Sequence, residues 1–103
     1  MDIPVIDERC QRVTTFFSLL DLVNSPAETV EQDDLEHLGV TLRSLWDWKE
    51  ITMVCQIWSD LNKNETLMKK ALPYVEVTGS LLGRWAVDES MRKRHYRGEG
   101  YNV

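Results

Sequence analysis

Apolar residues recur at steps of three and four along most of the chain, which is the spacing of one face of an α-helix. The clearest stretch predicts a helix over residues 5–23 whose apolar stripe faces a core. That stripe consists of Ile6, Cys10, Val13, Phe17 and Leu20. Only residues 74–78 alternate as a strand would, and no second strand is available to pair with them. We therefore expect an all-α fold, a small helical bundle of three to four helices.

A long central helix is predicted over residues 34–62, but its apolar residues fall into two groups. The first group is Leu35, Leu38, Leu42, Leu45 and Trp46, and the second is Trp48, Ile51, Val54, Cys55, Trp58 and Leu61. At about 100° per residue, the second group is rotated from the first by more than a right angle. Either the helix breaks or bends near residues 46–48, or it stays straight and buries different sides at its two ends. A straight helix would need a second subunit or a partner to cover both sides.

The segment before the central helix leaves two alternatives open. Residues 25–28, Ser-Pro-Ala-Glu, can form a capping box, and Asp33 and Asp34 suit a second helix start. A short helix over 26–32 ahead of the central helix is therefore an alternative to one continuous helix.

The segment after the central helix is predicted to be helical as well. Asn64 is a suitable cap for a helix that begins at the next residue. Pro73 then predicts a kink or a short break, because proline lacks an N–H donor and disfavours helical geometry at the residue before it. The helical period resumes over 74–95. Gly79 and Gly83 share one side of this helix, where they could either admit another backbone or lie in solvent.

Length and composition agree with one folded domain. A chain of 103 residues has the usual size of a single domain and can bury one modest core. Its hydrophobic fraction of 43% and charged fraction of 28% are those of a globular rather than a disordered protein. We expect a single helical domain over residues 1–97 and a flexible tail over 98–103.

The net charge of −5 is unevenly distributed along the chain. Residues 1–62 contain twelve acids and four bases, a net charge of −8, whereas residues 63–103 contain five acids and eight bases, a net charge of +3. The acidic segment 28–36 and the basic segment 92–97 could therefore attract each other, within one chain or between the two chains of a dimer.

The cysteines and the hydropathy bear on the compartment. Cys10 and Cys55 lie in apolar helical stripes and form no Cys-x-x-Cys pair, which predicts buried, reduced thiols rather than a disulfide framework. A reducing compartment, most simply the cytoplasm, is expected. No basic and apolar leader is visible at the start, and no apolar run is long enough to span a membrane.

Residues for catalysis or metal binding are not grouped in the sequence. His37 and His95 stand far apart, and adjacent acids on a helix do not share a face, so no acid–base pair is evident. The motifs of phosphate-binding loops, serine hydrolases and zinc proteases are absent. We therefore expect no enzyme, no metal and no cofactor.

Four of the nine aromatic residues are tryptophan, which is enriched where proteins bind one another. Trp46 and Trp48 are two residues apart and point to different sides of a helix. Either one of them stays exposed as an anchor, or the chain bends there and both are buried at the kink. We expect a small non-enzymatic interaction protein (an adaptor, inhibitor, chaperone or regulatory subunit) that binds another protein, itself as a homodimer, or both. The expected contact residues are Trp46, Trp48, Ile51 and Trp58.

A basic cluster supports the alternative of a nucleic-acid-associated regulator. Arg92, Lys93, Arg94 and Arg97 could neutralise phosphates. Cations in the last turn of a helix also occur simply because they complement its negative end. The acidic overall charge and the lack of a recognition helix favour protein binding over this alternative.

Overall fold

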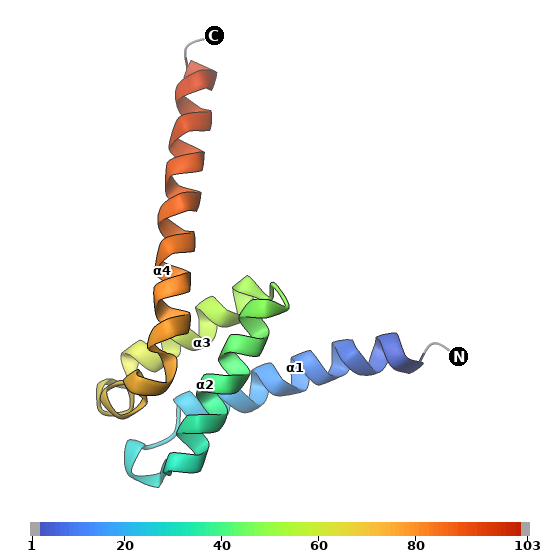
Figure 1. Cartoon of the computed structure of the whole chain (residues 1–103), viewed down its shortest axis with the longest axis vertical. Coiled ribbons are helices and arrows are strands. Elements are labelled where there is room, and N and C mark those ends of the chain that lie inside the picture. The colour runs from blue at the N-terminus through green and yellow to red at the C-terminus, as the bar shows by residue number, and fades with distance from the viewer. Residues whose placement is uncertain (1–2, 102–103) are drawn as a thin grey trace.

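The computed structural model confirms the all-α class (Figure 1). It describes the backbone of residues 3–101 and the side chains of residues 10–92. Over residues 3–101 the chain forms four α-helices and one 3₁₀ turn, and residues 74–78 are helical rather than extended. The elements are α1 (Ile3–Val23), the 3₁₀ turn (Ala27–Thr29), α2 (Gln32–Asp47), α3 (Ile51–Lys63) and α4 (Glu65–Tyr101). None of these helices combines the length and the apolar character needed to cross a bilayer.

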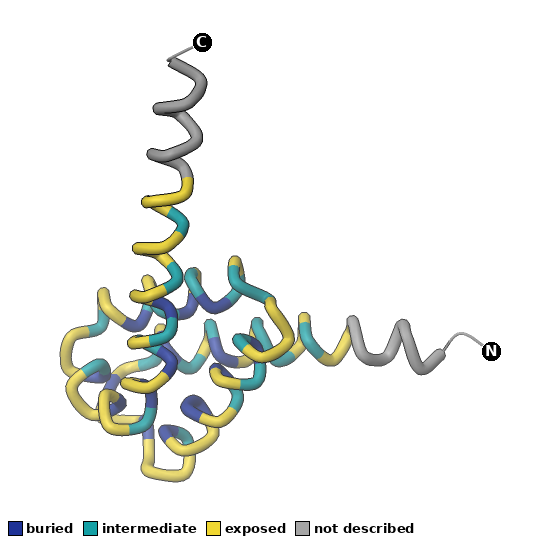
Figure 2. The backbone as a smooth tube through the Cα atoms, turned by 45° about the horizontal axis from the view of Figure 1, so that its top comes forward, coloured by how far each residue is buried: buried dark blue, intermediate teal, exposed yellow. Residues whose placement is uncertain are grey.

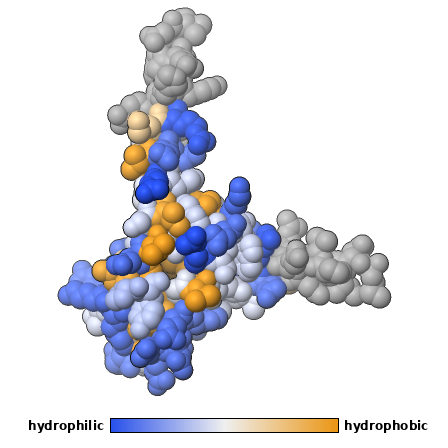
Figure 3. All heavy atoms as spheres, viewed as in Figure 1, coloured by the Kyte–Doolittle hydropathy of each residue, from blue (hydrophilic) through white to orange (hydrophobic). Residues whose placement is uncertain are grey.

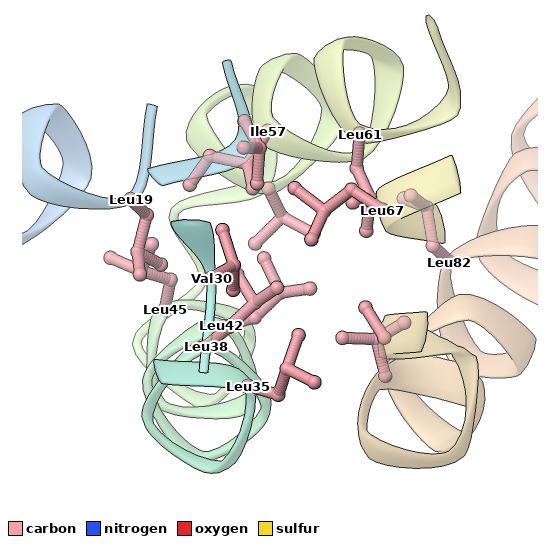
Figure 4. Packing of buried hydrophobic residues seen from close by; sticks show 14 of the residues in the cluster. Leu19, Val30, Leu35, Leu38, Leu42, Leu45, Ile57, Leu61, Leu67 and Leu82 are labelled. Carbon is pink, nitrogen blue, oxygen red and sulfur yellow. The ribbon is translucent and has the colours of Figure 1, made fainter. Parts of the chain in front are cut away.

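All four helices contribute to one apolar core (Figure 4). The leucines of α2 recur at steps of three and four and point toward residues of α3 and α4 across the core. The buried apolar residues are Leu19, Val23, Ala27, Val30, Leu35, Leu38, Leu42, Leu45, Val54, Ile57, Leu61, Leu67, Ala71, Val75 and Leu82. Burial of each of the larger side chains contributes about 1.5–3 kcal/mol. The core therefore lies where the helices cross, and residues 83–92 of α4 add no buried side chain to it.

The stripe predicted to bury α1 is wrong over most of its described part, where Leu20 is the one member that packs against the core. Phe17 is 61% exposed, and Cys10 is exposed instead of buried. The residues that enter the core are Leu19 and Val23, and Leu19 lies about 200° around the helix from Phe17. The reason is tertiary: only the C-terminal part of α1 reaches the core, so burial follows the face that meets α2 and α3 there (Figure 2).

The predicted long central helix over 34–62 is replaced by two helices. α2 ends at Asp47, and α3 begins at Ile51. Lys49 adopts the left-handed conformation with φ of 64°, and its N–H donates to the carbonyl of Trp46 at 2.9 Å. The N–H of Glu50 donates to the carbonyl of Leu45 at 3.0 Å, which completes a Schellman motif. The break lets both rotated apolar groups face a single core, as the first of the two alternatives required.

The position of Lys49 generates a stability prediction. A side chain in the left-handed region costs about 1–2 kcal/mol, whereas glycine adopts it without strain. Because glycine also loses more entropy on folding, Lys49→Gly is expected to raise the free energy of unfolding by about 0.5–1 kcal/mol. Lys69→Gly, at an exposed position inside α4, is the charge-matched control and should lower it by about 1 kcal/mol. Urea denaturation measures both; equal losses in the two variants would contradict the role of the turn.

The connection between α1 and α2 is a 3₁₀ turn, so neither the short helix over 26–32 nor one continuous helix is formed. Ser25 does not cap a following helix, because its hydroxyl donates back to the carbonyl of Asp21 at 2.8 Å. The ammonium of Lys70 donates to the carbonyls of Ala27 and Val30, both at 2.8 Å. One α4 side chain thus satisfies two carbonyls of the turn, where no regular helix could form.

Asn64 connects three helix ends. Its side-chain oxygen accepts from the N–H of Leu67 at 3.4 Å, which confirms the predicted cap of α4. Its amide donates to the carbonyls of Val23 at 3.2 Å and Ser25 at 2.9 Å, just after α1 ends. The same residue therefore separates α3 from α4 and satisfies carbonyls that α1 leaves without an intrahelical partner.

α4 is continuous through Pro73, so the kink alternative holds and the break does not. Figure 1 shows that the first part of α4 runs in another direction than the rest of the helix. A proline inside a helix removes one backbone hydrogen bond and bends the axis. The bend directs the remainder of α4 alongside α2, the helix with which it makes its closest association.

Gly39 of α2 is the point of closest approach to α4. A Cβ atom at this position would lie 3.2 Å from the Cβ of Tyr74 and would overlap the carbonyl oxygen of Tyr74. Gly79 of α4 is covered by the Trp58 ring, whereas a Cβ at Gly83 would meet nothing within 4 Å. Of these three glycines, Gly39 is therefore the one whose missing side chain lets two helix backbones approach each other.

The three glycines differ in a way that stability measurements can test. Gly39→Ala is expected to lower the free energy of unfolding by about 1–3 kcal/mol, because the new methyl group forces α2 and α4 apart. Gly83→Ala should raise it by about 0.5–1 kcal/mol, because alanine favours the helix and meets no neighbour. Thermal unfolding followed by circular dichroism measures both. A gain in stability for Gly39→Ala would show that the two helices are not in contact there.

Candidate protein-binding surface

The described surface carries large apolar side chains that the fold leaves uncovered. They lie on α1, on α2 and the turn that follows it, and on α4. They are Val13, Phe17, Val40, Trp48, Leu72, Val77, Val87 and Met91. Figure 3 shows apolar side chains between polar ones where α4 leaves the body of the molecule and farther along α4. Scattered apolar residues are normal on a surface, so the question is which of them are grouped and held in place.

Trp48 is held in place by two residues outside its own helix. It is the C-cap of α2 and is 41% exposed. The Arg12 guanidinium of α1 lies 5.2 Å from the centre of the Trp48 ring, a cation–π contact. Arg12 Nη1 is also 3.3 Å from Glu50 Oε1. The indole therefore presents an exposed face while its orientation is restricted by α1 and by the start of α3.

Trp46 has the opposite environment and is half-buried against the core. Together with Ile51 and Trp85 it lines a hollow of about 430 Å³ beside the α2–α3 turn. Asp47 and Lys49 form the polar part of its wall. Of the two alternatives for the Trp46–Trp48 pair, the structure has the one with an exposed member, because α2 ends between the two residues.

A second hollow lies in the groove between α2 and α4. It has a volume of about 500 Å³ and is lined mainly by apolar surface. The lining residues are Glu36, Gly39, Val40, Arg43, Ser44, Tyr74, Val77 and Thr78. Val40 and Val77 are 70% and 59% exposed. The Gly39 contact sets how deep this groove is, since it brings the two helices together at its floor.

Three of the four predicted contact residues lie together, and one does not. Trp46, Trp48 and Ile51 surround the α2–α3 turn. Trp58 packs against the core and against Gly79 of α4, where a Cβ would lie 2.8 Å from its ring carbon Cζ2. The contact between Arg12 and Trp48 was not predicted, because 36 residues separate them and nothing in the local pattern links them.

Of the basic cluster predicted to bind nucleic acid, Arg92 is the one residue whose side chain the structure describes. Its guanidinium lies 2.9 Å from the Glu89 carboxylate, one turn earlier on α4. The side chains of Lys93, Arg94 and Arg97, and the tail predicted over 98–103, lie outside the residues whose side chains are described. The nucleic-acid function stays a prediction.

Candidate catalytic and metal-binding residues are not brought together in the described part. Among these residues, no group of three or more His, Cys, Asp or Glu is placed to hold a metal ion. Cys10 and Cys55 are both free thiols.

Comparison with known protein families, curated proteins and solved structures finds no match for this chain. Its function is therefore inferred from the surface that the fold presents.

The Arg12–Trp48 contact predicts energetic coupling between α1 and the α2–α3 turn. In a double-mutant cycle, Arg12→Met and Trp48→Leu should show a coupling energy of about 0.5–1 kcal/mol in the free energy of unfolding. The same cycle with Arg12→Met and Leu72→Ala is the control and should give a coupling near zero. Equal coupling in both cycles would show that Arg12 does not stack on Trp48.

Proposed function

We propose that this chain is a small non-enzymatic interaction protein that binds another protein through the turn between α2 and α3. The contact surface is the Trp48 surface, defined as Trp48 with Arg12 beside it and the hollow lined by Trp46, Ile51 and Trp85. The observation that carries the proposal is the exposed, oriented indole of Trp48. Such a side chain contributes little to its own core and is free to enter a partner's pocket.

The environment of Trp48 supports an anchor role on energetic grounds. Tryptophan and arginine are the residues most enriched among those that dominate binding energy. A side chain that is already oriented in the free protein loses less conformational freedom on binding, and so more of its contact energy contributes to affinity. Arg12 supplies that orientation by stacking on the ring, and Glu50 holds the Arg12 guanidinium by an ion pair whose two side chains are 34% and 32% exposed.

The neighbouring hollow supports the same proposal. Its walls combine two indole rings with the charged side chains Asp47 and Lys49. This is the composition of a protein interface, in which an aromatic centre is surrounded by a polar rim. A partner that covers Trp48 would reach this hollow as well, because Asp47 and Lys49 flank Trp48 in the chain.

Affinity capture from a lysate of the host tests the proposal. Trp48→Ala should reduce the recovery of copurifying proteins at least tenfold, because truncation of an anchor typically costs about 2 kcal/mol or more. Leu72→Ala is the matched control: Leu72 is 45% exposed and lies outside the Trp48 surface, so its loss should leave recovery unchanged. Both variants are compared by thermal unfolding. Equal recovery with both, at equal stability, would refute the proposed surface.

A further inference from the structure

Among the side chains of residues 10–92, four of the five most exposed large apolar ones form a second surface, separate from Trp48. They are Val40 of α2 and Val77, Val87 and Met91 of α4, with exposed fractions of 70%, 59%, 57% and 63%. Val77 and Met91 are fourteen residues apart, which is close to four complete turns, and so they share one side of α4. Val87 lies one turn before Met91 on the same side. We call these four residues the α4 face.

The α4 face has a groove at one end and a ridge at the other. Val40 and Val77 line the α2–α4 groove of about 500 Å³. Val87 and Met91 lie farther along α4, beyond the last buried residue of the helix. Val77 and Met91 are about 21 Å apart along the axis, at 1.5 Å per residue. The α4 face thus combines a groove that can accept an apolar side chain with apolar side chains that project farther along the same helix.

We infer that the α4 face binds a second copy of this chain, with the two α4 helices antiparallel about a two-fold axis near Arg84. Arg84 is the midpoint between Val77 and Met91. A two-fold axis there places the ridge of each chain in the groove of the other, which is the self-complementarity that a symmetric interface requires. Met91 faces Val77 of the second copy, and its flexible side chain adapts to an irregular groove.

Charge complementarity supports this orientation. Arg92 follows Met91, and its side chain is 74% exposed, while Glu36 lines the groove end of α2. Within one chain Glu36 lies near the start of α2, whereas Arg92 lies about ten residues beyond the last buried residue of α4. In the antiparallel dimer Arg92 of one copy approaches the acidic start of α2 in the other. Within the described residues, the attraction that the sequence suggested between the two segments is then one between Glu36 of one chain and Arg92 of the other.

Arg84 itself is compatible with the axis. A two-fold axis at this position brings the Arg84 side chains of the two copies together. Asp88 of the second copy lies within one helical turn of that copy's Arg84, about 6 Å along the helix. Each guanidinium can therefore pair with a carboxylate of the other chain. The neighbouring Ser80 and Gly83 are small and exposed, which leaves room for the helices to approach.

The chain exposes more surface than a compact protein of the same mass. The chain exposes 7543 Å², whereas a compact protein of 12.0 kDa exposes about 6,000 Å². The excess is about 1,500 Å² per chain. Stable homodimers bury about 1,000–2,500 Å² per subunit, so the excess is comparable in size to one such interface.

Sedimentation of paired variants tests both the dimer and its register. The wild-type chain should sediment as a dimer at micromolar concentration. Val77→Glu alone and Met91→Lys alone should each raise the dimer dissociation constant at least tenfold. The double variant Val77→Glu/Met91→Lys should restore dimerisation, because each glutamate then faces a lysine of the other copy. Leu72→Glu is the control and should remain dimeric. All positions are exposed, and circular dichroism confirms that the variants fold.

A cysteine at the axis provides a second readout. In a Cys10→Ser/Cys55→Ala background, Arg84→Cys should form a disulfide-linked dimer under mild oxidation. Val77→Cys alone should not self-link, but should link to Met91→Cys when the two proteins are mixed. A monomer at 100 μM (an assay condition), a double variant that stays dissociated, or self-linking at position 77 would each overturn the inference. Trp48→Ala should leave the dimer intact, so this result is independent of the proposed binding partner.

Discussion

The reversal of the chain at Trp48–Glu50 determines how the rest of the molecule packs. The apolar groups before and after it point in different directions along a straight helix and cannot enter one core. The Schellman motif, with Lys49 at φ of 64°, ends α2 and starts α3 within three residues. Val54 and Ile57 then reach the same core as Leu42 and Leu45. The strain at Lys49 is small compared with the apolar burial that it makes possible.

The same reversal separates the tryptophans into two environments. Trp46 stays on the buried side of the last turn of α2, whereas Trp48 lies at the corner, where Arg12 of α1 can stack on it. A feature that is required by the core therefore also produces the most exposed of the four indole rings. The surface proposed for binding is a consequence of how α2 ends, not an addition to the fold.

Polar side chains hold the helices at their ends rather than in the core. Asn64 and Lys70 satisfy four carbonyls between Val23 and Val30. These bonds fix the segment that carries the chain from α1 to α2, which forms a 3₁₀ turn in place of a regular helix. The molecule is 18 Å thick in its shortest dimension, about two helix layers. Two layers offer each helix few neighbours, which is why the far part of α4 keeps an apolar face in solvent.

The sequence by itself determined the helical class, the cap at Asn64, the bend at Pro73 and the conflict between the two apolar groups of 34–62. These depend on periodicity and local backbone chemistry, which neighbouring residues encode. It also indicated that Trp46 and Trp48 would either be divided between core and surface or be buried together at a bend. Only the tertiary structure decided between these outcomes, because the result depends on where α2 ends and on Arg12, 36 residues away. The face of α1 that is buried was likewise decided by contact with α2 and α3, since Phe17 and Leu19 are both apolar and only the packing partner distinguishes them.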